Sequence, residues 1–408
     1  MTIRRNQLSA VALATALLGA VMPSRYSAAQ DSFGIEDREL KSTILNENRH
    51  YLISLPISYA DVAFGQRRYP VLYILDGESL MPLVSAIVRF MSDGRNRSWQ
   101  IPDMIMVGVV NVDRTRDMSP TRSLTTLNGK TSDMFDSSGG GKQFLTFLES
   151  ELVPEIDRQF RTVHFRTIVG HSFGGLSALS ALIDKPELFQ AYIAIDPSLW
   201  WDNRYLVRQA ISWSERARSI DARVFISAAG LDVSHGPFDR RPIWDKSIRD
   251  FAEILATNAT TRFSSQYKLY ESEDHGSIAL LTVYDGLLYI FREYRLNYAD
   301  LYQGPTHVQV HFDRVSKALG FQVLPPGPMI DNYAFFILKQ LDEEEKALDL
   351  LKLNAQNYPR SVFANERLGD ACVLVGDTTC AKQYYKRALN LDPGNEQLIT
   401  KSSTLSGN

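Results

Sequence analysis

The sequence predicts an α/β domain, with a mostly parallel sheet covered by helices on both faces, followed by a smaller all-α region. Between about residues 50 and 294, short apolar runs alternate with longer segments of helical periodicity, the order typical of such a sheet. Several of the runs are apolar without strict alternation, as expected of strands buried on both faces. Beyond residue 328 the pattern is helical and recurs with a period of 34 residues.

The α/β domain is assigned to residues 36–300. Its expected strands are the segments HYLISLPIS, YPVLYIL, MIMVGVVNV, RTIVG, AYIAID, RVFISAA and RFSSQYKLY. Helices are expected between them, over residues 79–92, 141–160, 173–183, 243–258 and 277–294. Parallel strands are connected by helical crossovers, so strands and helices alternate along the chain in this way.

Residues 1–29 have the composition of a secretory signal peptide. Arg4 and Arg5 precede an apolar stretch of about 15 residues, shorter than the roughly 20 that span a bilayer, and small residues follow up to Ala29. We therefore expect an exported bacterial protein, periplasmic or secreted, with no stable membrane span after the signal is removed. The formal net charge of −3 gives no general attraction to nucleic acid.

The C-terminal part is predicted to be a connector followed by helical repeats. Residues 301–328 lose the alternation of strand and helix and end in Pro-Pro-Gly-Pro. In residues 329–398, Ala347 recurs as Ala381 after 34 residues, the period of the tetratricopeptide helical hairpin. Two repeats fall short of the roughly three needed for independent stability, so they should pack on the α/β domain or on a protein partner. A plain helical cap is the alternative.

The sequence has only two cysteines, Cys372 and Cys380, which flank the segment VGDTT in the second repeat. In an oxidising compartment a disulfide between them is a reasonable hypothesis, and two unpaired buried cysteines are the alternative. No zinc or dinucleotide pattern occurs, so neither a metal nor another cofactor is expected.

The segment Gly170-His171-Ser172-Phe173-Gly174 matches the G-x-S-x-G pattern of a nucleophile elbow. It lies between a predicted strand and a predicted helix, which is the context that this pattern requires. A serine held in such a strained turn needs neighbours without a Cβ atom, and the start of a helix favours a developing oxyanion. Ser172 is therefore the predicted nucleophile, and a purely structural glycine turn is the alternative.

The base and the acid should follow the nucleophile in the order serine, acid, histidine. His275 lies directly after the last predicted strand and before a helix, which makes it the predicted base, with His235 as the rival. Asp232 follows the strand RVFISAA and is the predicted acid. Asp196 ends the preceding strand and is the alternative.

The oxyanion hole is predicted to use the main-chain amides of Phe173 and Gly77. Phe173 follows the nucleophile, which is the usual position of one donor. Gly77 follows the strand YPVLYIL, where a glycine permits close approach, although an ordinary β-turn is the alternative.

Four further residues are candidates for substrate binding. Arg114 and Arg116 follow the strand MIMVGVVNV, at the edge where α/β sheets bind ligands, and their guanidinium groups could hold an anionic substrate. Trp200 and Trp201 could form a wall of the substrate pocket. Solvent-exposed charge and core packing are the respective alternatives.

The sequence resembles the esterase D-like group of α/β hydrolases, most nearly its ferric enterobactin esterase branch. The resemblance rests on six blocks that occur in order over roughly residues 36–300, namely LYILDGES, VGVVNVDRTRDMSPT, GGGKQFLTFLESELVPEID, VGHSFGGLSAL, PELFQAYIAIDPSLWWD and EDHGS. It implies the α/β-hydrolase fold, with Ser172 as nucleophile, His275 as base and an acid at Asp232. Similar sequences often have a serine at the position of Asp196, and the helical tail is no part of the basic esterase.

The expected function is that of an exported serine hydrolase that cleaves a small-molecule carboxylic ester through an acyl-enzyme. Siderophore lactones and other aryl or acyl esters are the candidate substrates. Two alternatives stay open at this point. One is acyl transfer by the same triad, and the other is a non-catalytic scaffold that binds a protein through the helical repeats.

Overall fold

The structure is a computed structural model that describes residues 34–65, 67–94, 96, 99–217, 219–231, 241–341 and 343–405. The predicted signal peptide therefore lies outside the described residues. Within the described ranges, no helix combines the length and the apolar character needed to cross a bilayer.

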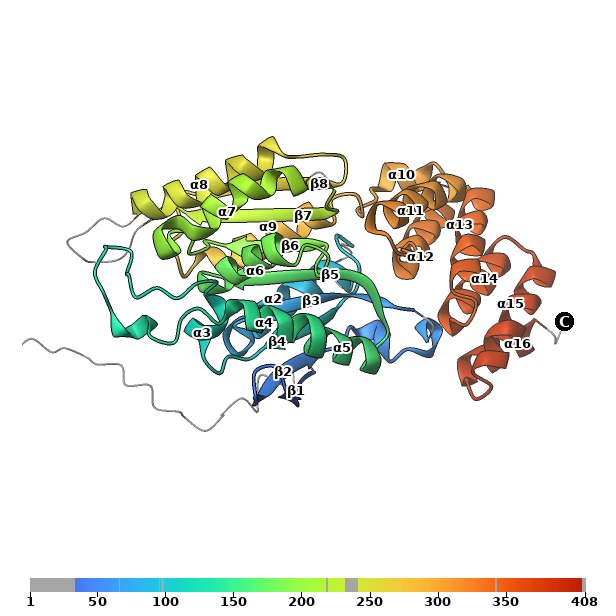
Figure 1. Ribbon diagram of the computed structural model, residues 1–408. Coiled ribbons are helices and arrows are strands. Elements are labelled where there is room, and N and C mark those ends of the chain that lie inside the picture. Colours follow the sequence, from blue (N-terminus) through green and yellow to red (C-terminus); the bar gives the residue numbers. More distant parts are fainter. Residues whose placement is uncertain are drawn as a thin grey trace, which may run out of the picture.

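One eight-stranded sheet forms the centre of the α/β domain (Figure 1). The strands lie in the order β1-β2-β4-β3-β5-β6-β7-β8; β2 runs antiparallel to both of its neighbours, and β3 to β8 are parallel to one another. Their bounds are β1 Ile35–Ser42, β2 Glu47–Ser54, β3 Tyr69–Leu75, β4 Ile105–Val109, β5 Thr162–His171, β6 Ala191–Ile195, β7 Ala222–Ala229 and β8 Phe263–Tyr270.

Helices cover both faces of this sheet. The helices α2 (Gly77–Ser92) and α9 (Ile278–Ile290) pack on one face. The other face is covered by α4 (Gly141–Phe147), α5 (Val153–Gln159), α6 (Phe173–Asp184), α7 (Trp201–Ala217) and α8 (Arg241–Thr257). Side chains alternate along a strand, so Ile74 of β3 joins the first core and Tyr73 joins the second. The predicted fold class is confirmed.

Several elements of this domain are not predicted by the sequence, among them β1 and α7. The strand β1 is an edge strand with the sequence IEDRELKS, and it pairs along its whole length with β2, from Ile35 opposite Ser54 to Ser42 opposite Glu47. Its charged, largely exposed residues carry no apolar alternation, although charge on an edge strand guards it against pairing with other chains. The helix α7 begins with left-handed residues, Asp202, Asn203 and Arg204, which no helical pattern indicates.

The C-terminal part is entirely helical where the structure describes it. Its helices are α10 Tyr298–Tyr302, α11 Pro305–Leu319, α12 Gly327–Phe336, α13 Glu344–Asn357, α14 Val362–Leu374, α15 Thr378–Leu391 and α16 Glu396–Thr404. The predicted connector, 301–328, contains α11, which starts at Pro305 and ends before Gly320 at φ +74°. Proline favours the first position of a helix as much as it breaks the interior of one, so composition alone does not predict this helix.

Consecutive helices from α12 to α16 pack against one another. A Cβ atom on Gly369 would lie 2.6 Å from the Tyr385 ring, so this glycine allows α14 and α15 to approach closely. Cys372 and Cys380 form a disulfide between the same two helices, which confirms the hypothesised pairing. The assignment of these helices to the tetratricopeptide class stays a prediction.

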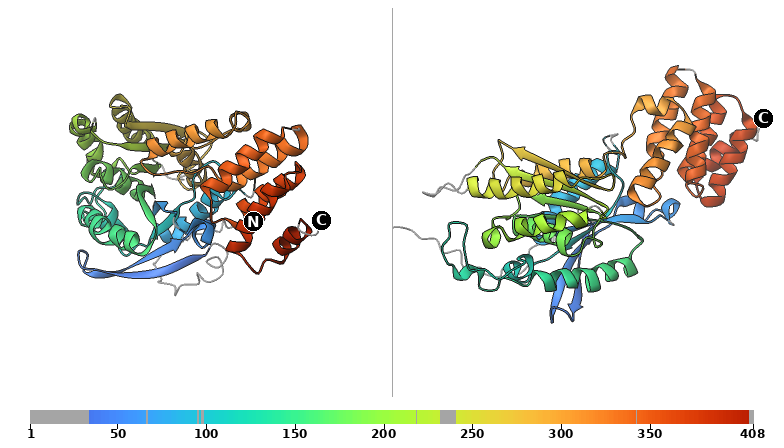
Figure 2. Two further views of the ribbon diagram at one scale, coloured as in Figure 1. Left: turned by 90° about the vertical axis from the view of Figure 1, so that its right-hand side faces the viewer. Right: turned by 45° about the horizontal axis from the view of Figure 1, so that its top comes forward.

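The helical region packs on the α/β domain at the edge where the parallel strands begin. The ring centroid of Tyr358 lies 5.2 Å from that of Phe64, which precedes β3, and Arg223 near the start of β7 donates a hydrogen bond to the Ala318 oxygen at 3.2 Å. Figures 1 and 2 show α10 to α16 beyond this end of the strands, whereas α3 (Arg114–Met118) lies at the opposite end, where the strands finish. The helical region is therefore remote from the edge that carries Ser172.

Candidate active site

Ser172 occupies a sharp turn between a strand and a helix. The strand β5 ends at His171, α6 begins at Phe173, and Ser172 between them has φ +60°, a value that is uncommon for a residue with a side chain. A Cβ atom on Gly170 would lie 2.2 Å from the main-chain oxygen of Gly174, so the motif requires glycine there. This strained strand-turn-helix geometry is that of a nucleophile elbow.

His275 and Asp196 form a hydrogen-bonded pair at the same edge of the sheet. Asp196 follows β6 and is completely buried, and its Oδ2 lies 2.6 Å from Nδ1 of His275. The other carboxylate oxygen accepts a hydrogen bond from the Ala229 amide at 3.1 Å. His275 follows β8, and its side chain is 40% exposed. A buried carboxylate that accepts from Nδ1 orients the imidazole and stabilises its charged form.

The predicted acid Asp232 and the rival base His235 lie in the segment 232–240, outside the described residues. The structure places Asp196, the alternative acid, against His275. In the sheet, β7 lies between β6 and β8, so the turn after β8 must cross the end of β7 to bring His275 to Asp196. Nothing in the sequence indicates that crossing.

The residues after β6 also hold the elbow. The Ser172 amide donates to the Ile195 oxygen at 2.9 Å, and the Ser198 amide donates to the Ser172 oxygen at 3.0 Å. The Ser198 hydroxyl, which is fully buried, lies 3.2 Å from the Ser172 hydroxyl. One short segment therefore contacts Ser172 directly and His275 through Asp196. Sequence reasoning missed Ser198, for which the only signal is its place two residues after Asp196.

The two predicted oxyanion donors, Phe173 and Gly77, are the first residues of helices that follow adjacent parallel strands. Phe173 begins α6 after β5, and Gly77 begins α2 after β3. Asp76 before Gly77 is left-handed, with φ +55°. A Cβ atom on Gly77 would lie 2.5 Å from the main-chain carbon of Gly108, so this position needs glycine. Both amides lie at helix N-termini, where the partial positive charge favours an anion.

Arg114 connects the turn after β3 with the turn after β5. Its Nε lies 2.6 Å from Oδ1 of Asp76, and its Nη2 lies 2.9 Å from Oδ2. The same Nη2 donates to the main-chain oxygen of His171 at 3.1 Å. The side chain is 36% exposed, so a substrate can still reach it. Its predicted contact with substrate stays a prediction.

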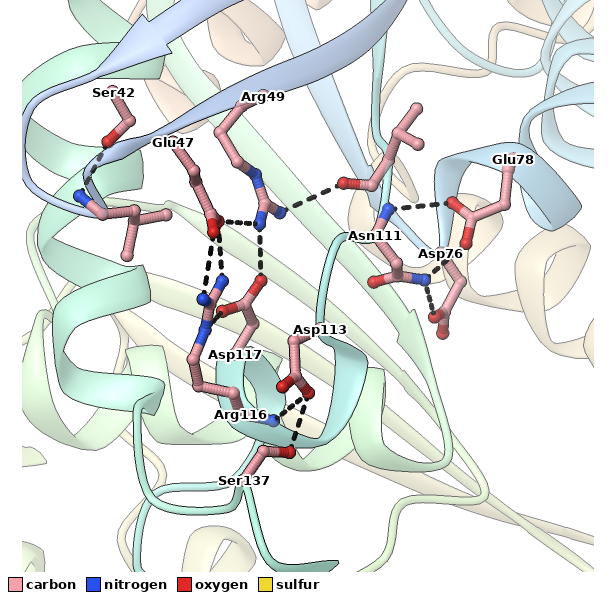
Figure 3. Close-up of polar contacts among 12 residues, drawn as sticks. Ser42, Glu47, Arg49, Asp76, Glu78, Asn111, Asp113, Arg116, Asp117 and Ser137 are labelled. Atoms are coloured by element: carbon pink, nitrogen blue, oxygen red, sulfur yellow. Dashed lines mark hydrogen bonds and ion pairs between the residues drawn. The ribbon is translucent and has the colours of Figure 1, made fainter. Parts of the chain in front are cut away.

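Arg116 belongs to a separate network between β2 and α3, shown in Figure 3. Its Nη2 lies 2.6 Å from Oε1 of Glu47, and its Nε lies 2.7 Å from Oδ1 of Asp117. Asp117 also accepts from the buried Arg49 at 2.6 Å. The hydrogen bond from Arg116 lowers the pKa of Glu47. All three nitrogens of the Arg116 guanidinium are hydrogen-bonded to Glu47 or Asp117, so its donors are directed at protein carboxylates and we leave Arg116 out of the proposed site.

The two predicted tryptophans differ in their surroundings. Trp201 is 1% exposed, and its ring packs 5.1 Å from that of Phe173. Trp200 is partly buried and lies between Phe173 at 6.2 Å and Trp244 at 5.9 Å. Trp244 of α8 in turn lies 4.9 Å from the His275 ring. These aromatic rings extend from the elbow to the histidine. Sequence reasoning missed Trp244, which looks like an ordinary residue of a helix.

His171, the residue before Ser172, contacts His275 in two ways. The two ring centroids are 4.3 Å apart, and Nε2 of His171 lies 2.6 Å from the main-chain oxygen of His275. A carbonyl oxygen can only accept, so Nε2 carries the proton and donates it. Burial, together with the nearby His275, lowers the pKa of His171 to about 4. The His171 imidazole is therefore neutral at neutral pH.

This low pKa predicts a loss of stability in acid. The ordinary pKa of histidine is about 6.5, whereas that of folded His171 is about 4. Between these pH values the unfolded chain binds a proton that folded His171 does not, so the free energy of unfolding decreases as the pH falls. Roughly 2 to 3 kcal/mol should be lost by pH 4.5. Urea unfolding at pH 7 and 4.5 measures it, and His171→Phe should lose less stability on acidification than the wild type. Equal losses in the two proteins would contradict the assignment.

Comparisons with known proteins agree with this geometry. The family model described as "Putative esterase" matches residues 42–276, a range that includes Ser172, Asp196 and His275. Ferri-bacillibactin esterase BesA of Bacillus subtilis is 27% identical over 255 residues, which are 60% of this chain and 85% of that protein. The siderophore triacetylfusarinine C esterase of Aspergillus fumigatus is 26% identical over 271 residues, covering 59% of this chain and 88% of that protein.

A solved structure is similar over a longer part of the chain. An IroE-like serine hydrolase from Shewanella oneidensis has a TM-score of 0.68 and 30% sequence identity. The similarity covers 79% of this chain and 99% of that one. Sequence and structure comparisons therefore point to the same group of proteins.

Proposed function

This chain belongs to the esterase family whose model it matches and is a carboxylic-ester hydrolase, and from that premise we propose that Ser172, His275 and Asp196 form its catalytic triad. The observation that carries this proposal is the strained elbow at Ser172 next to a histidine whose Nδ1 lies 2.6 Å from a fully buried carboxylate. Each of the three groups follows a different parallel strand, and all three strands end at one edge of the sheet.

In the proposed reaction the Ser172 oxygen attacks the ester carbonyl carbon while Nε2 of His275 takes the hydroxyl proton. The carbonyl oxygen becomes an oxyanion, which the amides of Phe173 and Gly77 stabilise. Collapse of this intermediate breaks the ester bond, and the departing alcohol takes the proton from His275. Water then attacks the acyl-enzyme, gives a proton to His275 and releases the acid, and the proton returns to Ser172.

The resting position of the Ser172 hydroxyl is consistent with this reaction. It contacts the Ser198 hydroxyl at 3.2 Å, and the proposed reaction requires it to turn toward His275. Catalytic hydrogen bonds are often long or misdirected before substrate binds. Asp196 keeps the imidazole in the tautomer that leaves Nε2 free to accept.

The proposed substrate is a small-molecule ester, with siderophore esters as the leading candidates. Relatives that match this chain are named as esterases of ferri-bacillibactin and triacetylfusarinine C. The rings of Trp200 and Trp244 offer an apolar wall beside His275 for an aryl or acyl group. Arg114 remains the proposed contact for an anionic group.

We also propose that the protein is exported. The first 29 residues have the pattern of a signal peptide, and the disulfide between Cys372 and Cys380 suits an oxidising compartment. Cleavage of the signal after Ala29 would make Gln30 the first residue of the mature chain. Mass spectrometry of the exported protein tests this directly.

The triad is tested by covalent labelling. The wild type should react with a fluorophosphonate probe, and peptide mass spectrometry should find the adduct on Ser172, with loss of activity on p-nitrophenyl esters and siderophore lactones in proportion to labelling. Ser172→Ala should not be labelled, whereas Ser212→Ala, which changes an exposed serine of α7, should be labelled like the wild type. A folded wild-type protein that neither reacts with the probe nor hydrolyses any of these esters would sink the proposal.

A further inference from the structure

We infer that His171 is a positioning residue that holds His275 in place beside Ser172, an inference that rests on the proposed function. His275 lies in the turn between β8 and α9 and is partly exposed. Its ring is held at Nδ1 by Asp196, and its main-chain oxygen is held by Nε2 of His171 at 2.6 Å. The hydrogen bond with Asp196 sets the orientation of the ring, and the hydrogen bond from His171 sets the position of the backbone that carries the ring.

Both hydrogen bonds come from the last residue pair between β5 and β6 or from the residue that follows it. His171 is the last residue of β5, and in the parallel register it lies opposite Ile195, the last residue of β6. Ser172 directly follows His171, and Asp196 directly follows Ile195. His171 is therefore the immediate chain neighbour of the nucleophile, and Asp196 is the immediate chain neighbour of Ile195, the pairing partner of His171. This arrangement sets the distance between nucleophile and base over very few covalent bonds.

The backbone of His171 is itself fixed. It pairs with Ile195 of β6, and its main-chain oxygen accepts from Nη2 of Arg114 at 3.1 Å. Arg114 is held in turn by both carboxylate oxygens of Asp76. A side chain mounted on such a support can hold a loop residue to within a few tenths of an ångström, which is the tolerance that catalysis demands.

Histidine suits this position for three reasons. It reaches the His275 oxygen with an N–H donor, and its ring packs against the His275 ring at a centroid distance of 4.3 Å. It is also neutral, so it does not oppose the positive charge that His275 acquires during the reaction. Phenylalanine would keep the ring contact without the donor. Glutamine would keep a donor of similar reach without the ring.

The test compares His171→Phe and His171→Gln with the wild type on a p-nitrophenyl ester. His171→Phe should lower kcat by about 10- to 100-fold while KM stays within about twofold, because substrate contacts are kept and only the placement of the base is lost. His171→Gln should recover most of that loss. His164→Phe, a change at an exposed histidine of the same strand, is the matched control and should behave like the wild type.

Hydrogen exchange of the amides at 273–277 gives a readout that does not need activity. Exchange there should be faster in His171→Phe and close to wild type in His171→Gln. A folded His171→Phe with unchanged kcat and unchanged exchange would overturn the inference, as would a His171→Gln variant as impaired as His171→Phe. If the wild type proves inactive but the exchange pattern is as expected, the proposed function fails and the positioning role stands.

Discussion

Replacing Asp196 by asparagine is expected to lower kcat for ester hydrolysis by on the order of 10⁴-fold without unfolding the protein. The change keeps the shape of the side chain, and the Ala229 amide keeps an oxygen acceptor. What is lost is the negative charge 2.6 Å from Nδ1 of His275, which stabilises the imidazolium and selects the tautomer. Steady-state kinetics with a p-nitrophenyl ester measures the loss in kcat, and a urea unfolding curve checks that the variant stays folded.

The comparison that decides the acid is Asp232→Asn, measured under the same conditions. Asp232 was the choice favoured by sequence position, whereas the structure shows Asp196 against the histidine. The loss in Asp232→Asn should be at least a hundredfold smaller than the loss in Asp196→Asn. A large effect at Asp232 with a small effect at Asp196 would reassign the acid to Asp232.

Gly170→Ala is expected to destabilise the protein by more than about 3 kcal/mol and to remove the elbow. The new Cβ would lie 2.2 Å from the Gly174 oxygen and 2.3 Å from its carbon. Both are main-chain atoms in the first turn of α6, so the clash can be relieved only by moving the helix away from β5. Urea unfolding gives the change in free energy, and the rate of fluorophosphonate labelling reports the elbow.

Gly394→Ala is the matched control for this substitution. No atom lies within 4 Å of a Cβ built at Gly394, so the same chemical change should shift the free energy of unfolding by less than about 1 kcal/mol. A Gly170→Ala variant as stable and as reactive as Gly394→Ala would show that the tight turn at Ser172 is not as the structure has it.

The helical region and the proposed active site lie at opposite ends of the parallel strands. Contacts through Phe64, Tyr358 and Arg223 place the helical region where the parallel strands begin. Ser172, Asp196 and His275 follow the opposite ends of their strands. The additional helices therefore lie at the end of the strands opposite the proposed active site.

Much of the α/β domain can be predicted because its signals are local. Most of the strands from β2 to β8 contain apolar runs, and Gly170 is required by its contact with Gly174, four residues along the chain. The strand β1 is not predicted because an exposed edge strand needs no apolar face. The helix α11 is not predicted because its proline, which could also break a helix, is the first residue of this one. These elements form through pairing and packing that their own residues do not reveal.

The sequence by itself determined the fold class, and it predicts the turn at Ser172 and His275 as the base, since each depends on a short segment and its order along the chain. Only the tertiary structure decided that His275 meets Asp196, that His171 holds its main chain, and that Arg116 is bound by carboxylates. The physical reason is that a turn is governed by the steric limits of adjacent residues. The partner of a side chain depends on how loops from distant strands cross, which many weak contacts determine together.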